Sequence, residues 1–519
     1  YYRAYRWATD RVGDQGIVAF VSAGGWVDGN TADGVRLSFA DEFAHLWIYN
    51  LRGNQRSAGE LSSKEGGKVF GSGSRSTIVI FVGVKDAAHS GPAQIHYRDI
   101  GDYLDREEKL RIAEVSTISN TDWREISPNS YGDWITQRDD AFGSWPVIGT
   151  KTQSDSLPIF ATYAYALLTA RDATVYNFSR SALLANVTAA ATAYSDVLAA
   201  YEQQRSADGK PSAAGDIDQF LFGSQNTTTA IKWSDSLKRH LLRGLPVMFD
   251  SSQAVEAAYR PFNRTNLYFD PVLNHRRGLL PTMFPTGLHT NYGLHLVAAG
   301  SDKPFSVLAV GMIPDLSFWG SGSSQFFPRY TYENVEPPID GVLDFDSTAD
   351  SPSEQEGGYR RVDNITDEIL DVYRTALGSS VTKDQIFWSV YGQLHVPGYR
   401  ETYAADLKKM LPHIPTPESL GRFTQLADAG EQLGTLHMQY EDVAPYPLDV
   451  EIRAGVEEHE RETWRVQKMK WRSKSDHTAI VYNSKVTITG IPLEAEEYML
   501  GSRSALAWII DRYQVKTDK

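Results

Sequence analysis

Three short, almost wholly apolar runs near the start of the chain constrain its fold more than any other feature. They are residues 16–21, 46–49 and 77–84. Runs this short and this apolar are typical of strands that are buried on both faces of a sheet. A helical pattern precedes the first run, and a second helical segment, which residues 30–33 can cap, separates it from the second run. The alternation of helix and strand predicts an α/β fold for residues 1–150.

The rest of the chain, residues 151–519, predicts a mixed α+β region. Residues 154–203 have a helical pattern of Ala, Tyr and Leu, and two further helices are expected at residues 362–377 and 382–394. Residues 340–358 are acidic and poor in large apolar side chains, which predicts a mobile stretch and offers a division into two subdomains. A length of 519 residues fits two or three domains.

Composition excludes several classes of site. The chain has 0 cysteines, so disulfides, cysteine zinc sites, iron–sulfur clusters and thiol nucleophiles are all excluded, and a cytoplasmic location fits. No apolar run approaches the length needed to cross a bilayer, so no membrane is expected as a partner. The formal net charge of −14 argues against a nucleic-acid partner. That charge is a global sum, however, whereas DNA binding needs only a local basic surface.

Searches for familiar catalytic motifs find little. The sequence has no Walker-type phosphate loop, no HExxH, no nucleophile elbow and no calcium loop. Gly24 and Gly25 follow a predicted strand but lack the rest of a dinucleotide fingerprint. The histidines, His275 and His395 among them, have no spacing that indicates a metal, so we interpret them as structural and expect no metal.

The loop at residues 66–75 is more informative. It reads Gly-Gly-Lys-Val-Phe-Gly-Ser-Gly-Ser-Arg, so Phe70 lies among four glycines and two cations. One interpretation makes Phe70 a buried anchor for the loop. The other uses the glycines for close approach of the backbone to a ligand, the cations for phosphates and Phe70 for stacking on a base.

Several segments resemble the type ISP restriction–modification enzymes. Those enzymes are long single polypeptides that join a nuclease, a helicase-like translocase, an adenine methyltransferase and a target-recognition domain. The most specific similarity is Lys64-Glu65-Gly66-Gly67-Lys68-Val69-Phe70-Gly71-Ser72-Gly73-Ser74-Arg75. Others are Tyr5-Arg6-Trp7-Ala8, Tyr49-Asn50-Leu51-Arg52-Gly53-Asn54, Tyr259-Arg260-Pro261-Phe262, Ile313-Pro314-Asp315-Leu316, Tyr391-Gly392-Gln393-Leu394-His395 and Ile488-Thr489-Gly490-Ile491-Pro492.

The resemblance implies how the chain is divided. Residues 1–150 would be the C-terminal portion of a γ-class adenine methyltransferase, a remnant of its Rossmann-like sheet, and residues 151–519 the target-recognition region. The family's Asn-Pro-Pro-Tyr/Phe motif and its glycine-rich segments for S-adenosylmethionine are missing, and residues 335–339 (Val-Glu-Pro-Pro-Ile) lack both the Asn and the aromatic. The chain is therefore expected to lack the cofactor half and to be inactive alone. S-adenosylmethionine is implied for the full-length enzyme, with none expected on this chain.

The same resemblance assigns roles to particular residues. Phe70 would stack on the flipped target adenine. Double-stranded DNA is the implied partner, together with the upstream nuclease and helicase-like domains. The candidate DNA contacts are Lys64, Lys68, Arg75, Arg239, Arg260, Arg264, Arg276 and Arg277. Arginine can read guanine bidentately, while lysine mostly meets phosphate. A further basic run at residues 465–474 is either an amphipathic face or a phosphate-contacting ridge.

Three functions remain open from the sequence. The first is a piece of an adenine-N6 DNA methyltransferase with its recognition domain. The second is a freestanding DNA-specificity module without chemistry of its own. The third is a protein-interaction domain, which the net charge of −14 favours slightly.

Overall fold

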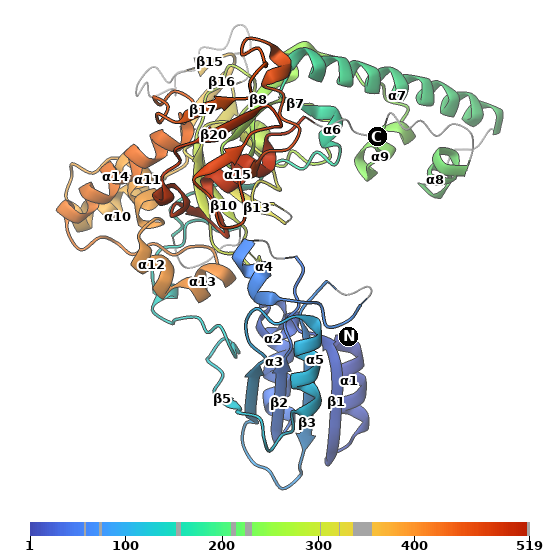
Figure 1. Cartoon of the computed structure of the whole chain (residues 1–519), viewed down its shortest axis with the longest axis vertical. Helices are drawn as coiled ribbons and strands as arrows, with labels where there is room; N and C mark the ends of the chain where they lie inside the picture. Colours follow the sequence, from blue (N-terminus) through green and yellow to red (C-terminus); the bar gives the residue numbers. More distant parts are fainter. Residues whose placement is uncertain are drawn as a thin grey trace, which may run out of the picture.

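The computed structural model of the chain has two lobes (Figure 1). It describes residues 1–56, 59–71, 75–151, 157–208, 214–223, 231–301, 303–320, 322–335 and 355–515. We call residues 1–140 the N-terminal lobe and residues 141–515 the C-terminal lobe. The predicted mobile stretch at residues 340–358 lies mostly outside the described residues, and so do residues 336–339.

The N-terminal lobe is built on a mixed sheet of order β1-β3-β2-β4-β5. Its strands are β1 (Gly16–Ala23), β2 (His45–Asn50), β3 (Ile78–Lys85), β4 (Gln94–Asp99) and β5 (Arg124–Ile126). Of the neighbouring pairs, β2 and β4 are parallel, and the others are antiparallel. The helices of this lobe are α1 (Tyr2–Arg11), α2 (Gly25–Asp28), η1 (Asn30–Ala32), α3 (Asp33–Glu42), α4 (Gly59–Glu65) and α5 (Arg106–Val115). The predicted α/β pattern is therefore present.

Only one face of this sheet is covered along its whole length. On that face Tyr5, Trp26, Phe39 and Phe81 form a cluster of tilted and edge-to-face rings. The other face is open at β1, where the side chain of Ile17 is 66% exposed. The prediction that this first run is buried on both faces is wrong, because β1 is an edge strand and no described helix covers its second face.

Within its described residues, the C-terminal lobe contains five small sheets, of orders β11-β10-β13-β6, β12-β8-β9-β7, β14-β16-β15, β17-β20-β19-β18 and β21-β22. Their strands are β6 (Ala164–Tyr165), β7 (Tyr176–Asn177), β8 (Ala254–Arg260), β9 (Asn263–Tyr268), β10 (Gly293–Val297), β11 (Val307–Val310), β12 (Ile313–Pro314), β13 (Ser324–Pro328), β14 (Tyr330–Asn334), β15 (Gln355–Glu356), β16 (Tyr359–Asp363), β17 (Asp449–Ile452), β18 (Lys470–Trp471), β19 (Ala479–Val481), β20 (Val486–Thr489), β21 (Met499–Leu500) and β22 (Arg503–Ser504). The lobe is of mixed α/β character, as predicted.

Two groups of helices flank these sheets. The first group is α6 (Asp172–Val175), α7 (Arg180–Asp208), α8 (Ala214–Gly223) and α9 (Asp235–Leu242), and the second is α10 (Asp367–Leu377), α11 (Lys383–Gln393), α12 (Pro397–Thr402), α13 (Ala404–Lys409) and α14 (Leu420–Met438). A separate helix, α15 (Ala505–Arg512), packs Trp508 into the same core as the first group. Short 3₁₀ turns η2 (Phe142–Ser144), η3 (Ser251–Gln253), η4 (Leu280–Thr282), η5 (Arg461–Thr463) and η6 (Leu493–Glu496) connect other elements. The helix predicted over residues 154–203 begins only at Arg180, because the residues from Ala164 to Asn177 form two short strands and α6.

Helix α7 extends from the body of the molecule (Figure 1). Over Arg180–Ser206 it is, by length and composition alone, long and apolar enough to cross a membrane. The prediction that no apolar run is long enough to cross a bilayer is therefore wrong for this helix. Its apolar character comes largely from alanine, and one side of the helix packs Leu183, Val187 and Tyr194 into the core of the C-terminal lobe.

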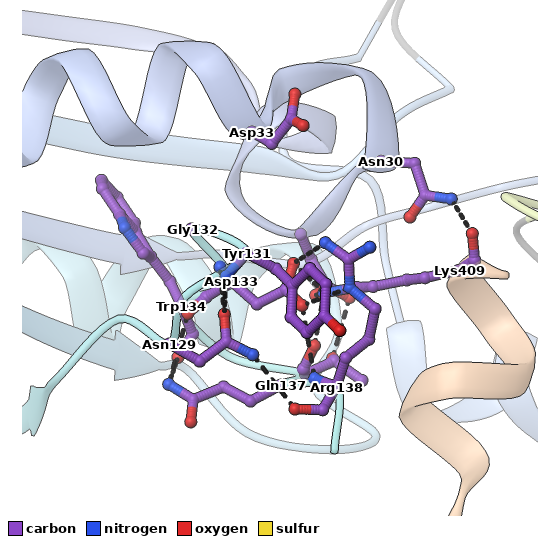
Figure 2. A network of polar contacts seen from close by, with 12 residues as sticks. Asn30, Asp33, Asn129, Tyr131, Gly132, Asp133, Trp134, Gln137, Arg138 and Lys409 are labelled. Atoms are coloured by element: carbon purple, nitrogen blue, oxygen red, sulfur yellow. Dashed lines mark hydrogen bonds and ion pairs between the residues drawn. The ribbon is translucent and has the colours of Figure 1, made fainter. Parts of the chain in front are cut away.

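A buried ionic network joins the two lobes (Figure 2). Asp133 of the N-terminal lobe accepts hydrogen bonds from Arg138 at 2.8 Å and lies 3.0 Å from the Nζ atom of Lys409, which belongs to α13. Arg36 donates to the carbonyl oxygen of Gly132 at 2.7 Å and also approaches Asp133. Asp28 pairs with Lys409 as well, at 3.2 Å. We call this network the lobe joint, and it sets how the N-terminal lobe sits against the C-terminal lobe.

Candidate nucleic-acid interface

The segment between β2 and β3 carries the most specific of the predicted site residues. It is not an irregular loop throughout, because α4 forms its middle. After α4, Val69 is buried, whereas Phe70 beside it is 48% exposed. Val69 therefore takes the anchoring place that one interpretation gave to Phe70, and the aromatic ring of Phe70 is presented to solvent. We call residues 64–71 the Phe70 loop.

Close backbone contacts hold the Phe70 loop against the start of α5. A Cβ atom on Gly66 would lie 2.1 Å from the carbonyl oxygen of Leu104, and one on Gly67 would lie 2.5 Å from the backbone nitrogen of Arg106. Gly66 also has a φ of +67°. Glycine is needed at both positions, since any other residue would push the loop away from α5.

A buried lysine supports the same loop from below. The Nζ atom of Lys109 donates to the carbonyl oxygens of Glu65 at 2.6 Å and Gly67 at 2.9 Å. Burial lowers the pKa of Lys109, although Glu65 opposes that shift. The side chain of Arg106 donates to the carbonyl oxygen of Val69 at 3.1 Å. These donors hold the backbone of the residues that precede Phe70, and so support the exposed ring from that side.

The cations predicted in this region are placed around the loop. Lys68 and Arg75 are exposed, and Arg75 donates to the carbonyl oxygen of Gln55 at 3.4 Å. Lys64 is partly buried, and its carbonyl oxygen accepts from Arg52 at 3.3 Å. Ser72, Gly73 and Ser74 lie outside the described residues. Two of the three predicted cations thus face solvent beside Phe70.

A second group of predicted cations lies at α9 and the turn after β9. Arg239 and Arg276 are exposed, and both lower the pKa of His275, for which burial is the larger cause. Arg277 lies over the ring of Phe269, 4.9 Å from its centroid. The structure therefore brings these three arginines into one neighbourhood, around a histidine that bonds to Ser236 at 2.9 Å.

The remaining predicted arginines have partners inside the protein. Arg260 is buried and donates to Asp315 at 2.7 Å, which is itself buried. Burial raises the pKa of Asp315 to about 6, although Arg260 opposes this shift. Arg264 lies 3.7 Å from a carboxylate oxygen of Glu441 and 3.9 Å from one of Glu256. In this structure Arg260 stabilises the core, and its guanidinium does not face solvent where DNA could reach it.

The basic run at residues 465–474 lies on an exposed segment that contains β18. Arg465 pairs with Glu462 at 3.4 Å and Arg472 with Asp476 at 3.6 Å. The ring of Trp471 stacks on His477, with centroids 4.5 Å apart. Nearby carboxylates therefore balance part of the positive charge of this run, as expected for an amphipathic surface segment.

Sequence reasoning missed a cationic cavity at the junction of the lobes. It has a volume of about 170 Å³ and is lined by Arg56 and Leu61 from the segment that includes α4, and by residues of the C-terminal lobe. Its other cations are Lys303, Arg503 and Arg512. These four residues come from three separate parts of the chain and form no run, so no local pattern could have indicated them.

The described residues do not form a pocket for S-adenosylmethionine after β1. A Cβ on Gly24 would lie 2.6 Å from a methyl group of Val79, and the backbone nitrogen of Gly24 bonds to the carbonyl oxygen of Thr77 at 2.7 Å. Trp26, which follows, is fully buried. This turn packs against β3 and offers no open cradle. Among the residues that the structure describes, no group of three or more His, Asp or Glu is placed to hold a metal ion.

Replacing Gly67 by alanine is expected to displace the Phe70 loop. The new Cβ would meet backbone atoms of Asp105 and Arg106, which cannot rotate away, so the loop must lift and Val69 must lose burial. Overpacking of this kind costs about 1–3 kcal/mol. Hydrogen exchange of residues 64–71, followed by mass spectrometry, measures the loss of protection.

The matched control is Gly71→Ala in the same loop, because a Cβ on Gly71 would meet nothing within 4 Å. Equal exchange in the two variants would show that the loop does not depend on its contact with α5.

The chain matches a protein-family model and is similar to solved structures over nearly its whole length. Residues 158–519 match the family model described as the Type ISP C-terminal specificity domain. The chain is similar to the nuclease-deletion mutant of the Type ISP restriction–modification enzyme LlaGI, solved in complex with a DNA substrate mimic. The identity is 35%, the TM-score is 0.80, and the match covers 99% of this chain and 44% of that one.

Two further solved structures are similar over the full length. For the ATP-dependent Type ISP restriction–modification enzyme LlaBIII bound to DNA, the identity is 28% and the TM-score 0.81, with 100% of this chain and 31% of that one covered. For the DrdV–DNA complex, solved by electron cryo-microscopy, the values are 28% and 0.79, with 100% and 48% covered. The chain thus spans less than half the length of each of these structures. No curated protein sequence matches it.

Proposed function

The chain belongs to the Type ISP restriction–modification family, whose C-terminal specificity domain it contains, and on that premise we propose that it recognises a specific duplex DNA site. The proposal is supported by its relatives, because LlaGI, LlaBIII and DrdV were each solved with DNA or a DNA mimic. Within a longer polypeptide, the upstream nuclease and helicase-like domains would be its partners, in the cytoplasm.

The Phe70 loop carries this proposal. An exposed aromatic in a loop held against α5, with the exposed cation Lys68 in the same loop and Arg75 shortly after it in the sequence, has the properties of a group that stacks on an unpaired base while phosphates are held nearby. Arg239, Arg276 and Arg277 offer a second contact region on the C-terminal lobe. Arginines there can read base edges or meet phosphate.

We further propose that the N-terminal lobe is the later part of a Rossmann-like methyltransferase sheet. In support, β1 and β2 point in the same direction with β3 reversed between them, and β2 is parallel to β4. In the longer polypeptide the product would be adenine methylated at N6, with Phe70 holding the flipped base. S-adenosylmethionine would be bound upstream, since the turn after β1 does not fit it, and this chain alone would not methylate.

A freestanding DNA-specificity module is the second candidate. The observation that favours it is the same packed turn at Gly24, which offers no open cradle for a methyl donor after β1. Calorimetry with S-adenosylmethionine tests both candidates, because each predicts that this chain alone does not bind it. A micromolar complex would exclude the module without chemistry and would also overturn the expectation that the cofactor binds upstream.

Duplex DNA is expected to bind this chain with an affinity that falls more than about tenfold between 50 and 200 mM salt, because each neutralised phosphate releases counterions. Fluorescence anisotropy of a labelled duplex measures the affinity at both concentrations. The net charge of −14 makes this result informative, since only a local basic surface can produce it. Affinity that does not depend on salt would instead favour a protein-interaction domain.

A further inference from the structure

The cationic cavity between the lobes has walls from three separate parts of the chain. Arg56 and Leu61 come from the segment that includes α4, which Figure 1 shows at the top of the N-terminal lobe, where it meets the C-terminal lobe. Lys303 and Trp319 come from the middle of the chain, and the turn and helix at residues 500–512 complete the wall. With a volume of about 170 Å³, the cavity has room for several groups of the size of water.

Cationic side chains predominate in the wall of this cavity. Four cationic side chains line it, and none of the described residues in its wall is acidic. Two of these cations share one carboxylate, since Asp511 pairs with Arg503 at 2.7 Å and with Arg512 at 3.1 Å. Burial lowers the pKa of Arg512, although Asp511 opposes that shift. In a chain with a net charge of −14, such a concentration of cations indicates a site for an anion.

Two buried donors in the wall also lack acceptors. The Nε1 atom of Trp319 and the Nε atom of Arg512 have no hydrogen-bond partner among the residues that the structure describes. The side chain of Trp319 is 95% buried, because its relative exposure is 5%. Buried donors without acceptors are costly, so native proteins satisfy nearly all of them. Because neither atom is accessible to solvent, an anion in the cavity would reach these donors only if the wall moved.

We propose that this cavity binds a phosphate group and so ties the N-terminal lobe to the C-terminal lobe when the protein engages DNA. The proposal deepens the DNA-binding function proposed above and rests on it. Arginine and lysine together satisfy phosphate oxygens through charge-assisted hydrogen bonds. The same chemistry fits a backbone phosphate of duplex DNA or a free phosphate anion, and these two sources can be told apart by experiment.

Binding of a phosphate group in the cavity would also restrict the motion of the Phe70 loop. Arg56 follows Gln55, whose backbone nitrogen donates to the carbonyl oxygen of Arg75 at 2.9 Å. The side chain of Gln55 donates to the carbonyl oxygen of Gly66 at 3.1 Å. A phosphate held by Arg56 therefore acts on a segment that is hydrogen-bonded to Gly66 within the loop and to Arg75 beyond it. This link makes Arg56 a positioning residue for Phe70.

The test uses the full chain with Arg56→Gln and Lys303→Gln combined, and Arg11→Gln as the matched control on the exposed end of α1. The cavity variant is expected to bind duplex DNA about tenfold more weakly at low salt. Its slope of log affinity against log salt should fall by about one for each phosphate that the variant no longer neutralises. DNA should slow hydrogen exchange at residues 64–71 in the unaltered chain, and should slow it less in the variant.

A second measurement separates the two sources of phosphate. Inorganic phosphate is added at constant ionic strength, and the melting temperature is followed. Weaker DNA binding in the cavity variant without any effect of inorganic phosphate identifies the DNA backbone as the source. A rise in melting temperature that the variant abolishes identifies a free anion.

The cavity proposal is overturned if the variant binds DNA as the Arg11→Gln control does and inorganic phosphate has no effect. The DNA-binding function stands in that case, provided that the unaltered chain still shows steep salt dependence. Absence of DNA binding by the unaltered chain would instead overturn the proposed function itself.

Discussion

Replacing Asp133 by alanine is expected to lower the free energy of unfolding of the chain by about 3–5 kcal/mol, because it leaves buried cations without their counter-charge. The side chains of Asp133 and Arg36 are fully buried, and that of Lys409 nearly so. Burial raises the pKa of Asp133, but hydrogen bonds from Arg138 and Lys409 outweigh it and bring that pKa to about 2. The carboxylate is therefore ionised at neutral pH, so its removal takes a full negative charge away from the buried cations. Urea unfolding followed by tryptophan fluorescence measures the change.

A control variant and a double-mutant cycle test this prediction more specifically. Asp14→Ala removes an exposed carboxylate of the same lobe, and its effect should stay within about 0.5 kcal/mol. A double-mutant cycle between Asp133→Ala and Lys409→Ala should give a coupling energy of about 0.5–3 kcal/mol, since the two side chains are in direct contact across the lobes. If Asp133→Ala costs no more than Asp14→Ala, the lobe joint does not hold the lobes together.

The sequence predicts the elements of the N-terminal lobe well, because its apolar runs are short and sharply bounded. It does not predict their pairing. The same runs could form a sheet covered on both faces, yet β3 pairs antiparallel between β1 and β2, and the second face of β1 stays open at Ile17. Strand order depends on which distant segments meet, and periodicity within one segment contains no information about that.

The same limit applies to the candidate site: local sequence indicates some of its residues, whereas others depend on distant contacts. The glycines and aromatic of the Phe70 loop are local in sequence, so a pattern can indicate them. Whether Val69 or Phe70 is the anchor depends on α5, some forty residues further on, so the sequence left that choice open. Arg260 looks like any other arginine in the sequence. Its buried partner, Asp315, lies 55 residues away, and only the fold shows that the two side chains meet.

Phe70→Ala, made in the longer polypeptide, is expected to slow adenine methylation by about 5- to 150-fold, the factor that corresponds to 1–3 kcal/mol of stacking on a base. Affinity for DNA should fall less, since phosphate contacts supply most of it. Phe70→Trp should restore most of the rate, because it keeps an aromatic face. Incorporation of labelled methyl groups measures the rate, and 2-aminopurine at the target position reports whether the base still leaves the helix.

Tyr446→Ala serves as the matched control, because it removes an exposed aromatic ring from the C-terminal lobe, outside the Phe70 loop. Phe70 is itself about half exposed, so its loss should leave the melting temperature nearly unchanged, and a slow variant cannot then be explained by unfolding. Methylation at the unaltered rate in Phe70→Ala would exclude a stacking role. A rate reduced equally in Phe70→Ala and Phe70→Trp, with the base still flipped, would show that the loop requires the shape of phenylalanine and not an aromatic surface for the base.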